Sequence, residues 1–289
     1  MMNLKLSLCV LLLLTFPSIS FARITGFSLD IEPSAGNDSI AFVNVMAQYR
    51  SLLTNTDLLL SADAGTAWSD PSIYETTVNG TTKLLSEWLI DLCNETIIMS
   101  YDRNATNLLV RVKPYLDYAD NIPNRSVIVG AAIATPGSTP TWWQTQTVKE
   151  LEEVIASVDP ELQGHSSFSK KYAIFYGETL LNATNAFPYK SIINETKTLW
   201  YISDDWVYDT NSRSNFFLFA INQNVVTLYD APHAGNRPHI GANKNDQQMY
   251  VDFINIAHTL GIDIQFMSGL NDFESDIEFI NSVNEKLVF

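Results

Sequence analysis

Two carboxylates stand two residues apart in an otherwise apolar segment near the start of the chain. Residues 26–33 read GFSLDIEP, and a period of two places Ser28, Asp30 and Glu32 on one face of an extended strand. The inside of a strand-built barrel is normally apolar, so this polar face predicts a site at a strand end. Paired carboxylates there supply general acid and base chemistry. The alternative is a solvated strand end that caps the next helix.

Three further apolar runs end in polar groups that suit such a site. Asp63 follows LLSA, the pair Tyr101 and Asp102 follows IIMS, and Glu178 ends the run YAIFYGE. Taken singly, the two aspartates are more typical of helix caps and turns than of catalytic groups. Taken with the first strand, they predict carboxylates gathered at one end of a sheet.

Aromatic and histidine side chains add candidates for ligand binding. Trp142 and Trp143 follow the fourth apolar run, where aromatic pairs stack on sugar rings, and a packed loop is the alternative. Asp205 lies near the end of a later run, and His233 lies in a long loop after Asp230. These loop residues match no strong metal-binding spacing, so no metal is expected.

The chain repeats a short apolar run followed by a segment of helical spacing, which is typical of βα units around a parallel sheet. Eight strands are expected, at Ile24–Glu32, Asp57–Ala64, Thr96–Tyr101, Ser126–Ala134, Tyr172–Glu178, Leu199–Trp206, Phe216–Asp230 and Ile262–Ser268. The long seventh run also reads as a hairpin about residues 222–224. Helical spacing of apolar residues occurs in Ile40–Leu53, Lys83–Leu92, Leu108–Tyr118, Val148–Val158, Gln248–Leu260 and Asp276–Leu287.

The mature chain reads as one domain. No linker or composition break divides residues 23–289, so we expect a single α/β domain, a (β/α)8 TIM-type barrel of parallel strands. A doubly wound open sheet is the alternative. No Gly-x-Gly-x-x-Gly or Walker-type loop follows any strand, so the nucleotide ligands usual for that fold lack support and we expect no cofactor.

Residues 1–22 read as a secretory signal peptide. They combine a basic start, the apolar run Leu6–Leu14 and a Ser20-x-Ala22 cleavage site, and the run is too short to span a bilayer. An uncleaved anchor is the alternative. Seven glycosylation sequons, none after Asn194, favour a glycoprotein that is secreted or kept in an endomembrane or vacuolar lumen. The sequons are at Asn37, Asn79, Asn94, Asn104, Asn124, Asn182 and Asn194.

Composition limits the partners and the means of stabilisation. A formal net charge of -15 argues against an electrostatic interaction with nucleic acid or with an anionic membrane, and no segment after the signal peptide resembles a membrane span. After signal removal Cys93 is the only cysteine, so no intrachain disulfide forms and the core must stabilise the domain. Cys93 itself is expected to be a small buried hydrophobe.

The strand ends resemble those of the chitinase-type, family 18, glycoside hydrolases. Gly26-x-x-x-Asp30-x-Glu32 is similar to the end of that family's Asp-Gly-x-Asp-x-Asp-x-Glu motif on its fourth strand. Leu60–Ala64 resembles the fifth strand, and Met99-Ser100-Tyr101-Asp102 resembles the sixth-strand Met-x-Tyr-Asp. Val127–Gly130 is similar to the seventh strand and Tyr172–Glu178 to the eighth. The resemblance covers roughly half of the chain and implies a (β/α)8 barrel.

The family's first three strands do not precede the motif here, and they are expected to follow it. Leu199–Trp206 resembles the first strand, Phe216–Asp230 the second and Gly261–Gly269 the third. This order implies a circular permutation, which barrels tolerate because their chain ends lie close together. The permutation predicts that Ile24–Glu32 pairs in parallel with Ile262–Ser268.

The resemblance implies a glycosidase that acts on N-acetylhexosamine-containing glycans. It assigns Glu32 as the acid that protonates the glycosidic oxygen, and Asp30 as the group that orients the N-acetyl group of the substrate. Tyr101 and Asp102 would stabilise the cyclic intermediate. Asp63, Glu178, Trp142, Trp143, Asp205 and His233 are expected to bind the sugar.

The motif also departs from the family, which leaves other functions open. Thr25 and Ser28 stand where the family has its first two aspartates, so a carbohydrate-binding barrel without turnover is an alternative. A third reading is a metal-dependent hydrolase such as a phosphodiesterase. It would use Asp30, Glu32, Asp63, Asp102 and His233.

Overall fold

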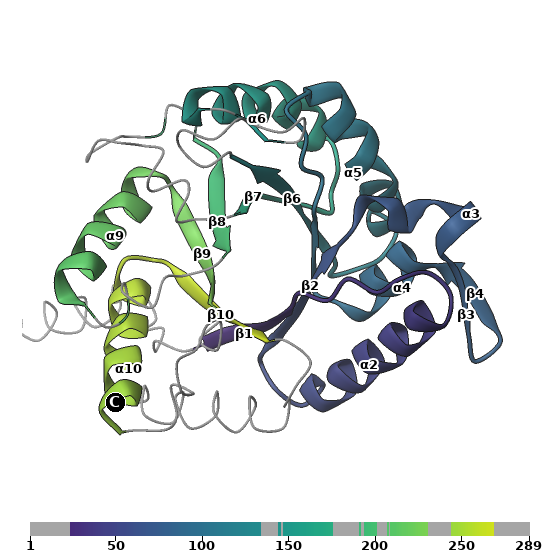
Figure 1. Ribbon diagram of the computed structural model, residues 1–289, viewed down its shortest axis with the longest axis horizontal. Coiled ribbons are helices and arrows are strands. Elements are labelled where there is room, and N and C mark those ends of the chain that lie inside the picture. The colour runs from purple at the N-terminus through teal and green to yellow at the C-terminus, as the bar shows by residue number, and fades with distance from the viewer. Residues whose placement is uncertain are drawn as a thin grey trace, which may run out of the picture.

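Eight parallel strands close into a barrel, with helices around the outside (Figure 1). The computed structural model describes residues 24–133, 144–145, 147–175, 191, 194–200, 207, 209–230 and 244–268. Around the barrel the strands follow the order β1-β10-β9-β8-β7-β6-β5-β2, so neighbours in sequence are neighbours in space. The expected (β/α)8 TIM-type fold is confirmed, and the open sheet is excluded.

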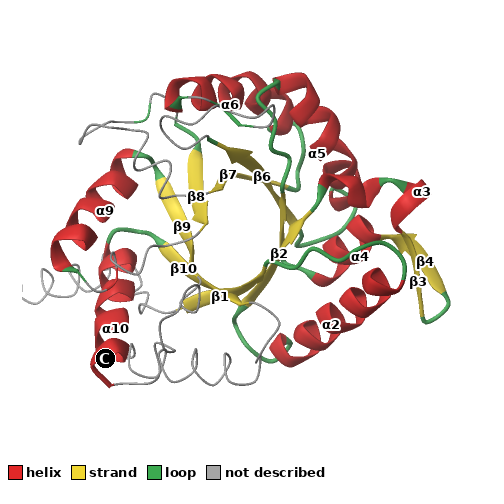
Figure 2. Ribbon diagram, in the orientation of Figure 1, coloured by secondary structure: helices red, strands yellow, loops and turns green. Residues whose placement is uncertain are grey.

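All eight predicted strands are present, with shifted ends. They are β1 (Ile24–Leu29), β2 (Leu59–Ala64), β5 (Glu95–Ile98), β6 (Ser126–Ala132), β7 (Phe168–Phe175), β8 (Thr196–Trp200), β9 (Val225–Asp230) and β10 (Asp263–Ser268). The predicted helices correspond to α2 (Asn37–Leu53), α4 (Leu85–Leu92), α5 (Ala105–Ala119), α6 (Val148–Leu162) and α10 (Lys244–Thr259). They form a ring outside the strands (Figure 2). The signal peptide and the helix expected at Asp276–Leu287 lie outside the described residues.

The barrel closes through β1. Its residues pair in parallel with β10, with Phe27 opposite Phe266 and Leu29 opposite Ser268, as predicted for the two ends of the chain. On its other side β1 pairs with β2, with Ser28 opposite Ser61. Every closed barrel of eight strands in sequence order joins its first and last strands. The pairing therefore confirms the barrel, and the circular permutation stays a prediction.

One strand assignment is wrong in part. The first half of Phe216–Asp230 is the helix α9 (Thr210–Asn222), and only its second half is the strand β9. The hairpin about residues 222–224 is therefore absent. The Asp209 side chain accepts a hydrogen bond from the backbone N–H of Ser212 and begins α9. Buried aromatic residues on several sides of this helix hide its period.

An additional hairpin precedes α4. The antiparallel strands β3 (Glu75–Val78) and β4 (Thr81–Leu84) join at Asn79-Gly80, where φ is 50° and 79°. Two left-handed residues make the tight turn that matches the twist of a hairpin. The helix predicted from Lys83 therefore begins only at Leu85. A short 3-10 helix, η1 (Thr66–Ser69), and one turn of helix, α3 (Pro71–Tyr74), lead into the hairpin.

The main core lies between the strands and the helices. Phe27 points outward from β1 and stacks on Tyr49 of α2 and on Phe266 of β10. Cys93 is fully buried in this layer, as expected for a small hydrophobe. Within the described residues, no helix is long and apolar enough to cross a membrane.

The inside of the barrel has an apolar middle. Ile97, Ile128, Ala173 and Tyr229 form a buried cluster there, with one side chain from each of β5, β6, β7 and β9. A filled middle of this kind makes the barrel a packed core rather than a pore.

Below this cluster, toward the N-terminal ends of the strands, the interior is polar. Gln265 donates a hydrogen bond to Glu95 at 2.8 Å and accepts one from Ser61. Lys171 Nζ lies 3.0 Å from the other Glu95 oxygen. Gly26 leaves room for this network, because a Cβ there would come within 3.0 Å of the Gln265 side chain. The charges inside the barrel floor are thus paired and hydrogen-bonded, as burial requires.

Candidate functional site

Two aspartates meet at the C-terminal mouth of the barrel. The parallel register pairs Ser28 with Ser61 and Leu29 with Ala62, so Asp30 at the end of β1 lies beside Asp63 near the end of β2. A side-chain hydrogen bond joins the two carboxyl groups. Asp63 is only 1% exposed, whereas Asp30 faces solvent at the mouth. This is the end of a (β/α)8 barrel at which active sites are built.

Two carboxyl groups form a hydrogen bond only when one of them carries a proton. Burial raises the pKa of Asp63 well above its usual range, and the neighbouring charge of Asp30 and the hydrogen bond to it raise the pKa further. Of the two carboxyl groups, Asp63 therefore holds the shared proton more readily, and Asp30 is the acceptor.

The pKa of Asp30 is also raised, although less strongly. The surrounding protein disfavours its charge even though part of the side chain reaches solvent, and the charge of Glu32 adds to this effect. The hydrogen bond from Asp63 acts in the opposite direction. Glu32 is exposed just beyond the strand and acts on both aspartates through its charge. The structure thus brings Asp30, Glu32 and Asp63 together.

Tyr101 follows β5, the strand that pairs with β2 and so lies next to the strand of Asp63. It packs, with Met99 and Met267, against the buried cluster in the barrel. Its ring lies over Gly130 of β6, where a Cβ would be 3.0 Å from Tyr101 Cε1 and 2.4 Å from the carbonyl oxygen of Ile98. Real Cβ atoms do not come this close, so only glycine leaves space for Tyr101 at this position.

Asp102 is turned toward helix α5. One of its oxygens accepts a hydrogen bond from the backbone N–H of Asn104 at 2.8 Å, and the other lies 3.2 Å from Arg111 Nη2. Asn104 in turn caps the helix by accepting from the N–H of Asn107. These contacts fix the turn between β5 and α5, and that turn follows directly on Tyr101. A part for Asp102 in the chemistry stays a prediction.

The remaining predicted ligand groups lie outside the described residues. They are Trp142, Trp143, Glu178, Asp205 and His233. Within the described part of the chain, no group of three histidine, cysteine, aspartate or glutamate side chains is arranged to hold a metal ion. The metal-dependent hydrolase stays an alternative, because His233 lies outside the described residues.

Neither the contact of Gly130 with Tyr101 nor the hydrogen bond between the two aspartates could be predicted from the sequence. Gly130 reads as one small residue in an apolar run, and only the β5–β6 pairing places it under Tyr101. Asp30 and Asp63 are each visible as a strand end. The register of β1 on β2 makes them a pair, and sequence spacing does not give that register.

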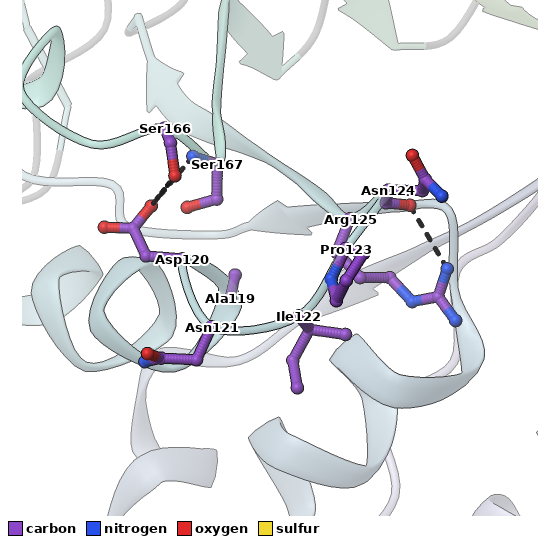
Figure 3. Close-up of a pocket in the computed structure, with 9 residues that line it drawn as sticks. All are labelled: Ala119, Asp120, Asn121, Ile122, Pro123, Asn124, Arg125, Ser166 and Ser167. Carbon is purple, nitrogen blue, oxygen red and sulfur yellow. Dashed lines mark hydrogen bonds between the residues drawn. The ribbon is translucent and has the colours of Figure 1, made fainter.

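A cavity of about 220 Å³ lies at the opposite end of the barrel (Figure 3). It is formed by the loop between α5 and β6 and by the residues that precede β7. Asp120 holds these segments together through Ser166 and Ser167. This cavity lies at the N-terminal ends of the strands, away from the carboxylates of the mouth.

Comparison with known proteins gives no family. The sequence matches no protein-family model, and a search of curated proteins finds no match. Among solved structures, the chain is similar to an uncharacterized protein from Clostridium thermocellum that binds two copies of 5-methyl-5,6,7,8-tetrahydrofolic acid. The TM-score is 0.45 and the identity 10%, over 92% of this chain and 96% of that one.

The chain is also similar to a modular endo-β-1,4-mannanase of glycoside hydrolase family 26 from Cellulomonas fimi. The TM-score is 0.47 and the identity 10%, over 87% of this chain and 66% of that one. At this level the similarity concerns the barrel architecture alone.

Proposed function

We propose that this protein is a glycoside hydrolase that cleaves N-acetylhexosamine-containing glycans at the mouth of the barrel. The observation that carries the proposal is the pairing of Asp30 with the buried Asp63 at the barrel mouth, with Glu32 beside them. Such a group supplies an exposed acid, a carboxylate that accepts hydrogen bonds from a substrate, and a buried partner that holds the carboxylate in place.

In this scheme Glu32 protonates the oxygen of the glycosidic bond as the leaving group departs. Asp30 accepts a hydrogen bond from the N–H of the substrate's N-acetyl group. This contact turns the acetyl oxygen toward the anomeric carbon, where it closes the cyclic intermediate that water later opens. Because the substrate supplies the nucleophile, the protein needs only the acid and the orienting carboxylate.

In the proposed site, Asp63 takes the place of an aspartate that the family 18 motif has and this chain lacks. Ser28 stands where that motif carries a second aspartate, and it cannot share a proton with Asp30 as a carboxyl group does. Asp63 provides that carboxyl group from the neighbouring strand. Tyr101 supports the same site, since Gly130 seats it on the barrel wall.

The proposed location is an acidic lumen or the outside of the cell. The signal peptide and the sequons support this location, and five of the described sequon asparagines are exposed: Asn37, Asn79, Asn104, Asn124 and Asn194. The raised pKa values of both aspartates suit work in acidic surroundings.

The test is release of reducing ends from N-acetylhexosamine oligomers by the mature glycoprotein. Glu32→Gln keeps the shape of the side chain and removes the transferable proton, so the rate should fall about 10²–10⁴-fold while the oligomer still binds. Glu87→Gln is the matched control, because Glu87 caps α4 through the N–H of Leu84 and lies outside the proposed site.

Two results would count against the proposal. Oligomer binding by the wild type without any release would favour the carbohydrate-binding barrel. Release that Glu32→Gln leaves within a few-fold of the wild-type rate would remove the acid from its assigned residue.

A further inference from the structure

Helices α9 and α10 are neighbours in the outer layer of the barrel (Figure 1). Phe216 and Phe217 of α9 pack against Phe253 of α10, with ring centroids 6.4 and 5.1 Å apart. Each helix leads into its own strand, so both end at the N-terminal side of the barrel. Their C-terminal halves therefore lie next to each other, on the side of the molecule away from the proposed active site.

The outer surface of these halves is apolar. Leu218 and Ile221 are 47% and 49% exposed, and they stand three residues apart on one face of α9. Ile256, in the last turn of α10, is 39% exposed. Leu260, which directly follows the helix, is 38% exposed and stands four residues further along the chain. These four residues form the α9–α10 face. They account for half of the large hydrophobic side chains that are exposed among the described residues.

The α9–α10 face also carries few charges, although the protein is strongly acidic. The only charged residue of α9 is Arg213, which is buried and donates a hydrogen bond to the carbonyl of Val207. The described exposed residues of α10 include one charge, that of Asp252. By contrast, α6 exposes Lys149, Glu153 and Glu161. Depletion of charge with exposed apolar groups is the composition of an interface core.

The distribution of sequons agrees with a covered surface. All seven lie at or before Asn194, and the residues from there to the C-terminus, which include α9 and α10, contain none. A glycan on either helix would block contact with another macromolecule. The sequence keeps this region free of glycan acceptors.

We infer that the α9–α10 face is the contact between two copies of this chain in a symmetric dimer. Two copies of this strongly acidic chain repel each other, so a surface that carries almost no charge is the one on which they meet with the least repulsion. In a two-fold contact the same patch meets itself, so any net charge on it would face a net charge of the same sign on the partner copy. An apolar, nearly neutral face satisfies both conditions.

A membrane is a poorer occupant for the same face. Attachment to an anionic bilayer requires lysine and arginine around the apolar residues, and the one basic residue of α9 is buried. The dimer is independent of the proposed glycosidase activity, because the α9–α10 face lies away from the barrel mouth.

Sedimentation velocity of the full mature glycoprotein tests the inference, at concentrations from about 1 µM to about 1 mM. The wild type should shift from one to two chains in mass, and added salt should strengthen the dimer by screening the repulsion between copies. Leu218→Glu with Ile256→Glu places four carboxylates in the contact and should weaken dimerisation about 100-fold or more. Both residues are exposed, so circular dichroism should show an unchanged fold.

Val110→Glu is the matched control, because Val110 is 68% exposed on α5 and lies outside the α9–α10 face. It should leave the dimer intact. A wild type with the mass of one chain at every concentration would overturn the inference, as would a dimer that Leu218→Glu with Ile256→Glu leaves unchanged. A single-chain wild type that binds neutral phosphatidylcholine vesicles would also overturn it and assign the face to a lipid surface.

Discussion

Replacing Asp120 by asparagine tests how the barrel floor is held together. Asp120 follows α5 and accepts hydrogen bonds from the backbone N–H of Ser167 at 2.8 Å and the hydroxyl of Ser166 at 3.1 Å (Figure 3). His165 Nδ1 lies 2.7 Å from its other oxygen. Burial alone would raise the pKa of Asp120, but the hydrogen bonds from Ser167, His165 and Ser166 outweigh it and lower the pKa to about 2.

The magnitude follows from this shift. The difference between the usual value of 3.8 and about 2 corresponds to about 2.4 kcal/mol at about 1.36 kcal/mol per unit. Because 27% of the Asp120 side chain is exposed, solvent screening reduces this to about 1–2 kcal/mol. A lowered pKa adds stability above the usual value, and that stability is lost as the pH falls from 3.8 to about 2.

Urea unfolding at about pH 7 and at about pH 2 measures the effect. Asp120→Asn should lower the free energy of unfolding by about 1–2 kcal/mol at the higher pH and by close to zero at the lower one. Asp117→Asn is the control, since Asp117 is exposed near the end of α5 and its side chain pairs with Lys113 at the surface. It should cost less than about 0.5 kcal/mol. Equal losses for the two variants, or a loss for Asp120→Asn that does not depend on pH, would refute this reasoning.

Three further predictions test the fold and the processing. Gly130→Ala should lower the melting temperature by about 5–10 °C, because the added methyl group meets a backbone carbonyl at 2.4 Å; calorimetry measures this. Lys197→Met should destabilise by about 3–5 kcal/mol in urea, because it removes the ammonium group that lies 3.3 Å from the buried Glu152 carboxylate, and the double variant with Glu152→Leu should recover most of the loss. Mass spectrometry should find a glycan on Asn104 that Thr106→Ala removes and Thr106→Ser keeps, and a bare wild-type Asn104 would contradict the glycoprotein assignment.

Much of the barrel is visible in the sequence because its strands are short apolar runs with regular polar ends. Residues 27–32 alternate clearly between apolar and polar, and within β1 the outward Phe27 meets a helix while Ser28 points into the barrel. Helix α9 was not predicted, because its apolar residues do not show a clear helical period. Phe216, Phe217 and Phe219 bury several sides of the helix, and such a segment reads as a strand.

The candidate site was predictable only as separate strand ends. Asp30, Asp63 and Tyr101 each stand out as polar residues after apolar runs, and the barrel brings their strands together. Which of the three forms a pair depends on the register between β1 and β2, and tertiary packing sets that register. The proton on Asp63 depends in turn on burial, which appears only once the barrel has closed.

The most direct test of the central claim is the rate of oligosaccharide hydrolysis by two variants of Asp63. If Asp63 acts as a neutral hydrogen-bond donor to Asp30, then Asp63→Asn, whose amide N–H can donate in the same place, should keep kcat/KM within a few-fold of the wild type. Asp63→Leu fills the same space without a donor and should lower kcat/KM about 10- to 100-fold, the value of a hydrogen bond to a charged group. Equal rates for the leucine variant and the wild type would contradict the claim that the Asp30–Asp63 pair organises the site.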